Sequence, residues 1–287
     1  MQKRIFKVSF AALVVALLGL AVCFFPAKAQ ALDLYDNFDG VEYLNPDLWH
    51  ASTGDFGGEL DVVREIERSN SKKDKNNGKL RMKATAYSWE GGGYEFGTRF
   101  NNPLGGGSQN ITAMEAEVKI TECEFSACGT EWNQITEPRF EMLGSFFSTG
   151  LAPSPPSCVP GPENWDEVHA SIFLRPTPDD GGNIFHVWGR IARHPHDVFN
   201  DYWYDLGTDL GWIVEKGDTV TVGLRWNPAG HSFIFQLDNM TEEISYGPLL
   251  AAIEGTDTDP PCGGFKSIRP MIGLPGNCPE VMSMGSL

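Results

Sequence analysis

Basic residues are scarce in this sequence. It holds 22 lysines and arginines against 38 aspartates and glutamates, which gives a formal net charge of −16 at pH 7. A surface of that sign repels nucleic acids and other polyanions. We therefore expect no nucleic-acid partner. The charge suits a neutral or cationic partner, and it equally serves solubility in a salty medium.

Long apolar runs are missing after the N-terminus, so we expect no membrane span in the rest of the chain. The one such run, residues 10–25, follows three basic residues and precedes Ala-Lys-Ala at residues 27–29. This order is typical of a cleaved export signal, residues 1–29, rather than of a membrane anchor. Cleavage removes four basic residues and no acid, which lowers the formal net charge from −16 to −20. The protein is expected to be secreted or periplasmic.

Metal-binding cysteine patterns are missing as well. The sequence has no Cys-x-x-Cys pair and no histidine cluster beside its cysteines, which disfavours a zinc site. In an oxidising compartment, the short loop from Cys123 to Cys128 predicts one disulfide, and Cys262 with Cys278 or Cys158 predicts a second. One cysteine is left over.

Helical periodicity is absent beyond the signal, which excludes a helical domain. Alternating apolar and polar segments occur instead, separated by clusters of Gly, Pro, Asn and Asp. They predict one all-β domain over residues 32–287, an antiparallel two-sheet sandwich with a single core. Residues 69–77, 152–164 and 254–264 are expected to be surface loops, and the C-terminus shows no obvious final strand, so it is expected to hold a short strand or to be truncated. The predicted strands are residues 78–87, 92–100, 113–120, 138–147, 167–175, 183–192, 218–226 and 231–238.

The order of these segments resembles the concanavalin A-like jelly-roll sandwich, and within it the layout of glycoside hydrolase family 16, the laminarinase-like enzymes. The opening "YDNFDGVEYLNPDLWHAS" looks like that superfamily's usual start. Residues 217–239 look like its paired strands that end in an Asp-Gly turn, with Asn239 in place of Gly. The match spans roughly residues 34–239. It implies a jelly-roll fold and a carbohydrate ligand.

In that family a strand of the form Glu-x-Asp-x-Glu carries the chemistry. Aligning "EVHAS" with it puts Glu167 at the nucleophile, His169 at the middle Asp and Ser171 at the acid/base. Two of the three acids are therefore absent, and a glutamate nucleophile without a protonated carboxyl lacks help for its leaving group. His169 can in principle donate a proton near physiological pH. The alternative is that Glu167 and His169 only form a polar, solvated sheet face.

The next predicted strand carries a second set of polar residues. In "NIFHVWGRIA" alternation puts His186, Trp188 and Arg190 on one side. An aromatic ring flanked by hydrogen-bonding groups is what sugar recognition needs, although Trp188 can also pack under a loop. Trp203 lies in an aromatic-rich segment that we expect to be a loop, where it can rim the same cleft or pack between the sheets.

Two acids near the start of the domain, Asp36 and Asp39, offer oxygen ligands for a structural calcium ion, a role that the resemblance implies. We expect no other cofactor.

Our leading hypothesis is an exported, lectin-like domain that binds a neutral polysaccharide or glycan through Glu167, His169, His186, Trp188 and Arg190. A second hypothesis is a glycoside hydrolase with an atypical catalytic strand, whose acid comes from another strand, for example Glu141. A third is a laminin G-like adhesion or structural domain that binds protein.

Overall fold

The computed structural model describes residues 33–36, 47–50, 52–55, 61–68, 80–88, 96–103, 110–124, 137–150, 167–194, 204–261, 265–274 and 283–286. The chain divides into two compact units, residues 1–33 and 34–287, and almost everything described belongs to the second.

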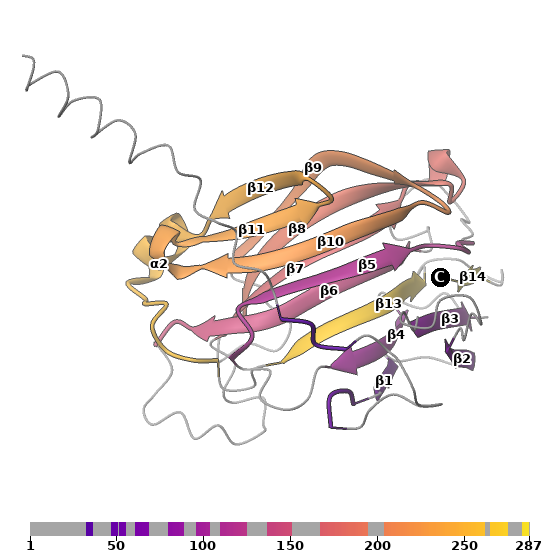
Figure 1. The fold of residues 1–287 in the computed structure, drawn as a ribbon, viewed down its shortest axis with the longest axis horizontal. Helices are drawn as coiled ribbons and strands as arrows, with labels where there is room; N and C mark the ends of the chain where they lie inside the picture. Colours follow the sequence, from indigo (N-terminus) through magenta and orange to yellow (C-terminus); the bar gives the residue numbers. More distant parts are fainter. Residues whose placement is uncertain are drawn as a thin grey trace, which may run out of the picture. The chain divides into compact units, whose positions relative to one another are not determined.

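Antiparallel strands in three sheets make up this unit (Figure 1). The largest sheet has seven strands, in the order β1 (Ser52–Asp55), β4 (Phe96–Pro103), β13 (Lys266–Leu274), β6 (Glu137–Ser148), β7 (Glu167–Pro176), β8 (Ile184–His194) and β9 (Tyr204–Glu215). The four-stranded sheet has the order β12 (Met240–Ser245), β11 (Ser232–Leu237), β10 (Thr219–Asn227) and β5 (Ala113–Lys119). A third sheet holds β14 (Ser283–Ser286), β3 (Leu80–Ser88) and β2 (Asp61–Arg68).

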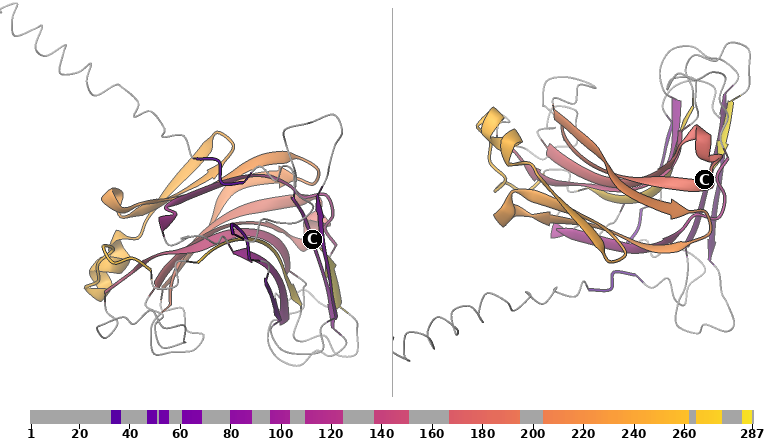
Figure 2. Two further views of the ribbon diagram at one scale, coloured as in Figure 1. Left: turned by 60° about the horizontal axis from the view of Figure 1, so that its bottom comes forward. Right: turned by 90° about the horizontal axis from the view of Figure 1, so that it is seen from above.

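The seven-stranded and four-stranded sheets pack face to face over one hydrophobic core (Figure 2). On β7, the alternate residues Val168, Ala170, Ile172 and Leu174 are at most 1% exposed and belong to this core. The sheets come close at Gly189 of β8, where an added Cβ would lie 3.2 Å from the Phe235 ring of the other sheet. Burying each such aliphatic or aromatic side chain contributes about 1.5–3 kcal/mol, which makes this layer the main source of stability.

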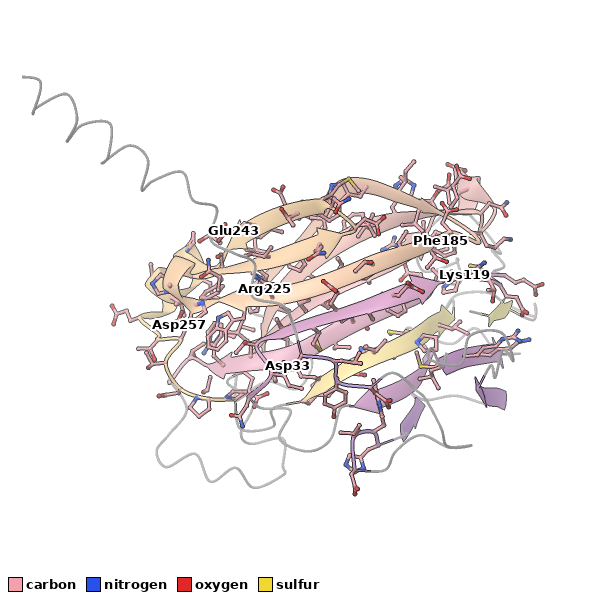
Figure 3. All side chains as sticks on the ribbon, in the orientation of Figure 1. Asp33, Lys119, Phe185, Arg225, Glu243 and Asp257 are labelled. Atoms are coloured by element: carbon pink, nitrogen blue, oxygen red, sulfur yellow. The ribbon has the colours of Figure 1, made fainter. Side chains whose placement is uncertain are left out.

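The opposite face of the four-stranded sheet is polar. Lys119, Arg225 and Glu243 lie there, pointing away from the core (Figure 3). This alternation of core-facing and solvent-facing residues is what "AMEAEVKI" and the strands after it predict.

All eight predicted strands are present, and the predicted fold class, an all-β antiparallel jelly-roll sandwich, is confirmed. One expectation about loops is wrong. Tyr204 and Trp212, from the same aromatic-rich segment as Trp203, belong to the edge strand β9 instead of a loop, and Trp212 packs against the core, as the packing alternative for this segment predicts.

Strand β13 was not predicted from the sequence. It lies between β4 and β6, in the middle of the largest sheet (Figure 1), although it contains Pro270, a residue that is normally confined to edge strands. The ladder between β13 and β4 is interrupted at Arg269 and Pro270, whereas the ladder between β13 and β6 is continuous. The missing N–H of Pro270 therefore interrupts only the β4 side of the sheet.

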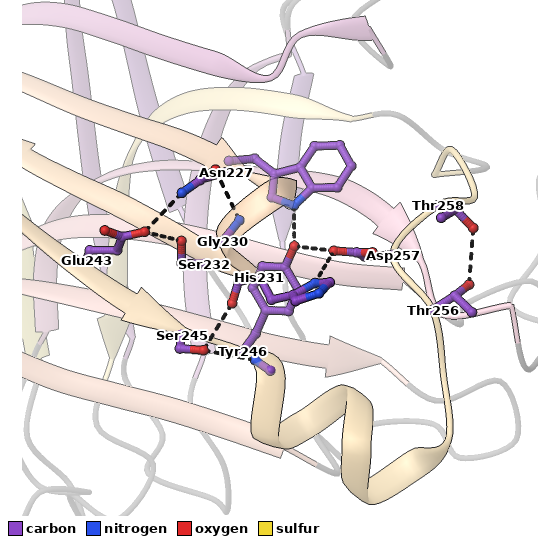
Figure 4. A network of polar contacts seen from close by, with 12 residues as sticks. Asn227, Gly230, His231, Ser232, Glu243, Ser245, Tyr246, Thr256, Asp257 and Thr258 are labelled. Atoms are coloured by element: carbon purple, nitrogen blue, oxygen red, sulfur yellow. Dashed lines mark hydrogen bonds and ion pairs between the residues drawn. The ribbon is translucent and has the colours of Figure 1, made fainter. Parts of the chain in front are cut away.

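A polar network fastens the short helix α2 (Gly247–Ile253) and the segment after it to the sandwich (Figure 4). The buried Tyr246 hydroxyl accepts from Trp226 Nε1 at 2.7 Å and donates to Asp257 Oδ2 at 2.6 Å. His231 Nδ1 lies 2.9 Å from the same carboxylate oxygen. Burial and the Asp257 carboxylate raise the pKa of Tyr246 well above its usual value. Residues 254–261 are thus a loop, as expected, but one whose Asp257 is buried rather than at the surface.

The disulfide pairings and the export signal stay predictions. Cys123 is buried, and burial raises the pKa of its thiol to about 11. Residues 1–29 and the expected loops 69–77 and 152–164 lie outside the described residues, as do the other cysteines of the predicted pairs: Cys128, Cys158, Cys262 and Cys278. Within the described ranges, no helix has the length and apolar character needed to cross a membrane.

Candidate functional site

The candidate site lies on the face of the seven-stranded sheet that points away from the four-stranded sheet. We call this surface the site face. Residues Glu167, His169, Ser171, Phe173 and Arg175 of β7 lie on it, because they alternate with the core residues of that strand. The alternation expected from the sequence is therefore correct.

Strand register arranges the site face in rows that cross the sheet. The aromatic row runs from Arg269 (β13) through Glu141 (β6), Phe173 (β7) and Trp188 (β8) to Asp209 (β9). On one side of it, the next row contains Arg139, Arg175 and His186. On the other side, Ser171 is paired with Arg190, and Ser145 with His169 in the row beyond.

The aromatic row holds two parallel rings. Phe173 and Trp188 have ring centroids 6.3 Å apart and planes only 7° from parallel. Phe173 is 7% exposed, whereas Trp188 is partly exposed. Guanidinium groups lie over both rings, with Arg139 Cζ 5.4 Å from the Phe173 centroid and Arg175 Cζ 5.8 Å from the Trp188 centroid. Stacking and cation–π contacts thus fix the orientation of Trp188.

His186 and Arg190 flank Trp188 on β8, as the sequence predicts. His186 Nε2 lies 3.1 Å from Asp180 Oδ2, and its Nδ1 lies 4.0 Å from Asp209 Oδ2. A hydrogen bond from Thr177 and, to a smaller extent, the contact with His186 lower the pKa of Asp180. Trp203, the other residue expected to contact a ligand, lies outside the described residues.

Glu167 and His169, the two residues considered for catalysis, both contact a third residue, Ser145, which the sequence does not single out. Ser145 Oγ donates to Glu167 Oε2 and lies 2.9 Å from His169 Nε2. The serine has one proton and gives it to the glutamate, so its oxygen accepts from an Nε2–H of His169. His169 Nε2 also lies 3.5 Å from Glu167 Oε2.

This cluster argues against the alternative that Glu167 and His169 only form a polar, solvated sheet face. Glu167 is 8% exposed and Ser145 is fully buried, so the face is not simply solvated at this point. The Nε2 proton of His169 is directed at Ser145 and Glu167, not at a ligand. A retaining glycosidase separates its two catalytic groups by about 5–5.5 Å with the sugar between them. Glu167 and His169 instead contact each other.

Glu141 was the candidate acid from another strand, and its surroundings argue against that role. Its Oε2 accepts from Arg269 Nε at 2.8 Å and from Arg269 Nη2 at 2.6 Å. Both side chains are buried. A guanidinium in such contact stabilises the deprotonated carboxylate, which has no proton to donate.

Lys266 lies beneath the cluster, on the core side of the sheet. It is fully buried, donates to the backbone carbonyl of Ser145 and lies with Nζ 4.6 Å from the Phe146 ring centroid. Gly144 leaves room for it, because an added Cβ there would lie 2.2 Å from Lys266 Cδ. Burial lowers the pKa of Lys266 to about 8, while the negative charge of Glu167 opposes that shift.

The calcium site stays untested. Asp36 Oδ2 accepts from Trp49 Nε1 at 2.7 Å, and the Tyr35 ring packs edge-on against Trp49. Asp39 lies outside the described residues. Among the residues that the structure does describe, no group of three His, Cys, Asp or Glu side chains is arranged to hold a metal ion.

Comparison with known proteins gives distant structural likenesses. The chain is similar to an endo-β-1,3-glucanase from Pyrococcus furiosus (12% identity, 89% of this chain and 91% of that one, TM-score 0.38). It is also similar to a laminarinase catalytic domain from Thermotoga maritima (11%, 89% and 94%, 0.37) and to lectin II from Ulex europaeus (10%, 83% and 95%, 0.24). No family model and no curated protein matches the chain.

Likenesses this distant carry no information about activity or ligand. The function must be inferred from the site face itself.

Proposed function

We propose that this chain is an exported glycan-binding domain that holds a saccharide on its site face without cleaving it. The observation that carries the proposal is Trp188. Its partly exposed ring is fixed by Phe173 and Arg175 and is flanked by His186 and Arg190. An oriented aromatic ring stacks on the apolar face of a sugar, while polar neighbours read its hydroxyl groups.

Cleavage is disfavoured by the state of the three candidate acids. At the position of the family's acid/base the chain has Ser171 instead of an acid. The other two candidates are held by other residues, His169 by Ser145 and Glu141 by Arg269. On the described part of the site face, none of these three side chains is arranged to protonate a leaving group. General acid catalysis contributes about 10²–10⁴-fold to such reactions, so its loss argues for binding over turnover.

The proposal is tested by affinity electrophoresis and calorimetry of the mature protein on a panel of β-glucans, galactans, xylans and acidic polysaccharides. Trp188→Ala should abolish retention of any polysaccharide that the wild type binds. Met240→Ala removes an exposed hydrophobic side chain on β12, in the other sheet, and should leave retention unchanged. Retention that survives Trp188→Ala would place the binding site elsewhere, and a wild type that binds no saccharide would favour a protein-binding domain.

A further inference from the structure

Three basic side chains lie next to one another on the site face, beside the aromatic row. Arg175 on β7 is paired with His186 on β8. The register of β6 with β7, which pairs Phe140 with Leu174, puts Arg139 opposite Arg175 one step further along. We call Arg139, Arg175 and His186 the basic row. Like charges directly opposite each other destabilise a sheet, so this row requires nearby anions.

The anions supplied by the described residues do not balance the two arginines. Glu137 is shared by both, with Oε2 3.7 Å from Arg139 Nη1 and Oε1 3.5 Å from Arg175 Nη2. Both distances exceed that of a good hydrogen bond. Neither arginine is paired with the neighbouring acids, since Asp180 and Asp209 contact His186, the third member of the row, and Glu141 is bonded to Arg269. Two guanidinium groups therefore share one carboxylate.

Arg139 has unused hydrogen-bonding capacity. Its Nη2 donates to Met271 Sδ at 3.0 Å, and a thioether is a weak acceptor. Its Nε is buried and has no hydrogen-bond partner among the described residues. Among the described residues the Arg139 guanidinium therefore faces only a weak acceptor and a carboxylate 3.7 Å away, so its positive charge is poorly neutralised.

The position of the two arginines relates this poorly neutralised charge to the proposed sugar site. Arg139 lies over Phe173, and Arg175 lies over Trp188. A sugar ring stacked on Trp188 would bring its substituents next to Arg175, which is 37% exposed and thus accessible from solvent. A planar guanidinium binds carboxylate and sulfate oxygens with two parallel hydrogen bonds.

We infer that the saccharide held on the site face carries an anionic substituent, a carboxylate or a sulfate ester, which is bound by the basic row. The inference rests on the proposed function. It proposes an acidic saccharide as the ligand, where the net charge of the chain suggests a neutral one. Net charge describes the whole surface, whereas fields in physiological salt are screened beyond about 8–10 Å. The local excess at Arg139 and Arg175 therefore determines which sugar binds here.

The test compares matched pairs of polysaccharides, one pair sulfated and desulfated, the other carboxylated and carboxyl-reduced. The wild type should bind an acidic member at least about tenfold more tightly than its neutral counterpart, the contribution expected of a charge-assisted hydrogen bond. Preference within the sulfated or the carboxylated pair identifies the anion. The preference should weaken as salt is raised.

Variants separate this role from a structural one. Arg175→Gln should remove the preference, and Arg175→Lys should retain part of it. Arg225→Gln makes the same change on the outer face of the four-stranded sheet and should have no effect. Glu137→Gln removes the carboxylate that competes for both arginines, so it should strengthen acidic binding, a gain that a purely structural role of Glu137 cannot produce.

The outcomes distinguish failure of this inference from failure of the proposed function. Equal binding of acidic and neutral members, abolished by Trp188→Ala, would overturn the inference and leave the proposed function in place. Absence of binding to every polysaccharide would overturn both. An acidic preference that persists in Arg175→Gln and is unchanged in Glu137→Gln would show that the basic row is not the anion site.

Discussion

Phe173 and Trp188 face each other across β7 and β8 with their ring planes 7° from parallel. The less exposed of the two is Phe173, so it acts as a support for Trp188. A ring that is already oriented loses little conformational freedom when a ligand binds. The relationship explains why Trp188 is suited to stack on a sugar.

Shortening the supporting ring should weaken binding without unfolding the domain. An aromatic pair contributes about 0.5–1.5 kcal/mol beyond buried area, so Phe173→Leu should reduce glycan affinity roughly two- to tenfold. Calorimetric titration measures the affinity, and thermal unfolding checks the fold. Phe235→Leu changes a core ring in β11 and should lower stability while leaving affinity intact. Unchanged affinity in Phe173→Leu would mean that Trp188 needs no support.

Much of the site face could be predicted, because alternation on a strand depends only on the backbone. "EVHASIFLR" and "NIFHVWGRIA" place Glu167, His169, His186, Trp188 and Arg190 on one side, and the structure agrees. The same alternation applies to Phe173 and to Ser145 in "EMLGS". Both were missed because an apolar ring and a small hydroxyl look like ordinary strand residues.

Other parts of the site depend on pairing between distant segments, which no local pattern reveals. The partner of Glu141 is Arg269 on β13, a strand that is hard to predict from the sequence because it contains Pro270. The β6–β7 ladder shifts register between Ser145 and Phe147, a bulge that puts consecutive phenylalanines into the core. The basic row likewise arises only when β6, β7 and β8 lie side by side.

Ser145→Ala should destabilise the cluster that Ser145 forms with Glu167 and His169. The substitution removes a donor from a buried carboxylate, which costs about 1–3 kcal/mol. In the double variant Ser145→Ala/Glu167→Gln the two costs should be less than additive, because both remove the same interaction. Urea unfolding of the four proteins in this cycle measures the coupling. Strict additivity would contradict the hydrogen bond.

Lys266 should make stability depend on pH. Burial lowers its pKa from 10.5 to about 8. Between these values the unfolded chain keeps a proton that the folded chain has lost, so stability rises with pH across this window and is lowest below pH 8. Lys266→Met should therefore be more stable than the wild type at pH 7, by up to roughly 3 kcal/mol. The difference should shrink towards pH 10.5 in urea titrations. A difference independent of pH would contradict the assignment.

The buried Glu141–Arg269 pair should respond differently to single and double changes. Glu141→Gln leaves the Arg269 charge buried without its carboxylate and should cost about 3–5 kcal/mol. Glu141→Leu combined with Arg269→Met removes both charges and should recover much of that loss. Thermal unfolding of both variants gives the comparison. Equal destabilisation by the two would show that the pair itself contributes net stability.

The most direct test of binding without cleavage is to assay retention and reducing-end release by the same mature protein on the same polysaccharides, with Glu167→Gln alongside. We expect retention on at least one polymer that Trp188→Ala abolishes, no release of reducing ends, and at most a modest loss of retention in Glu167→Gln. Release of reducing ends that disappears in Glu167→Gln would contradict the account and make Glu167 the nucleophile of an atypical hydrolase.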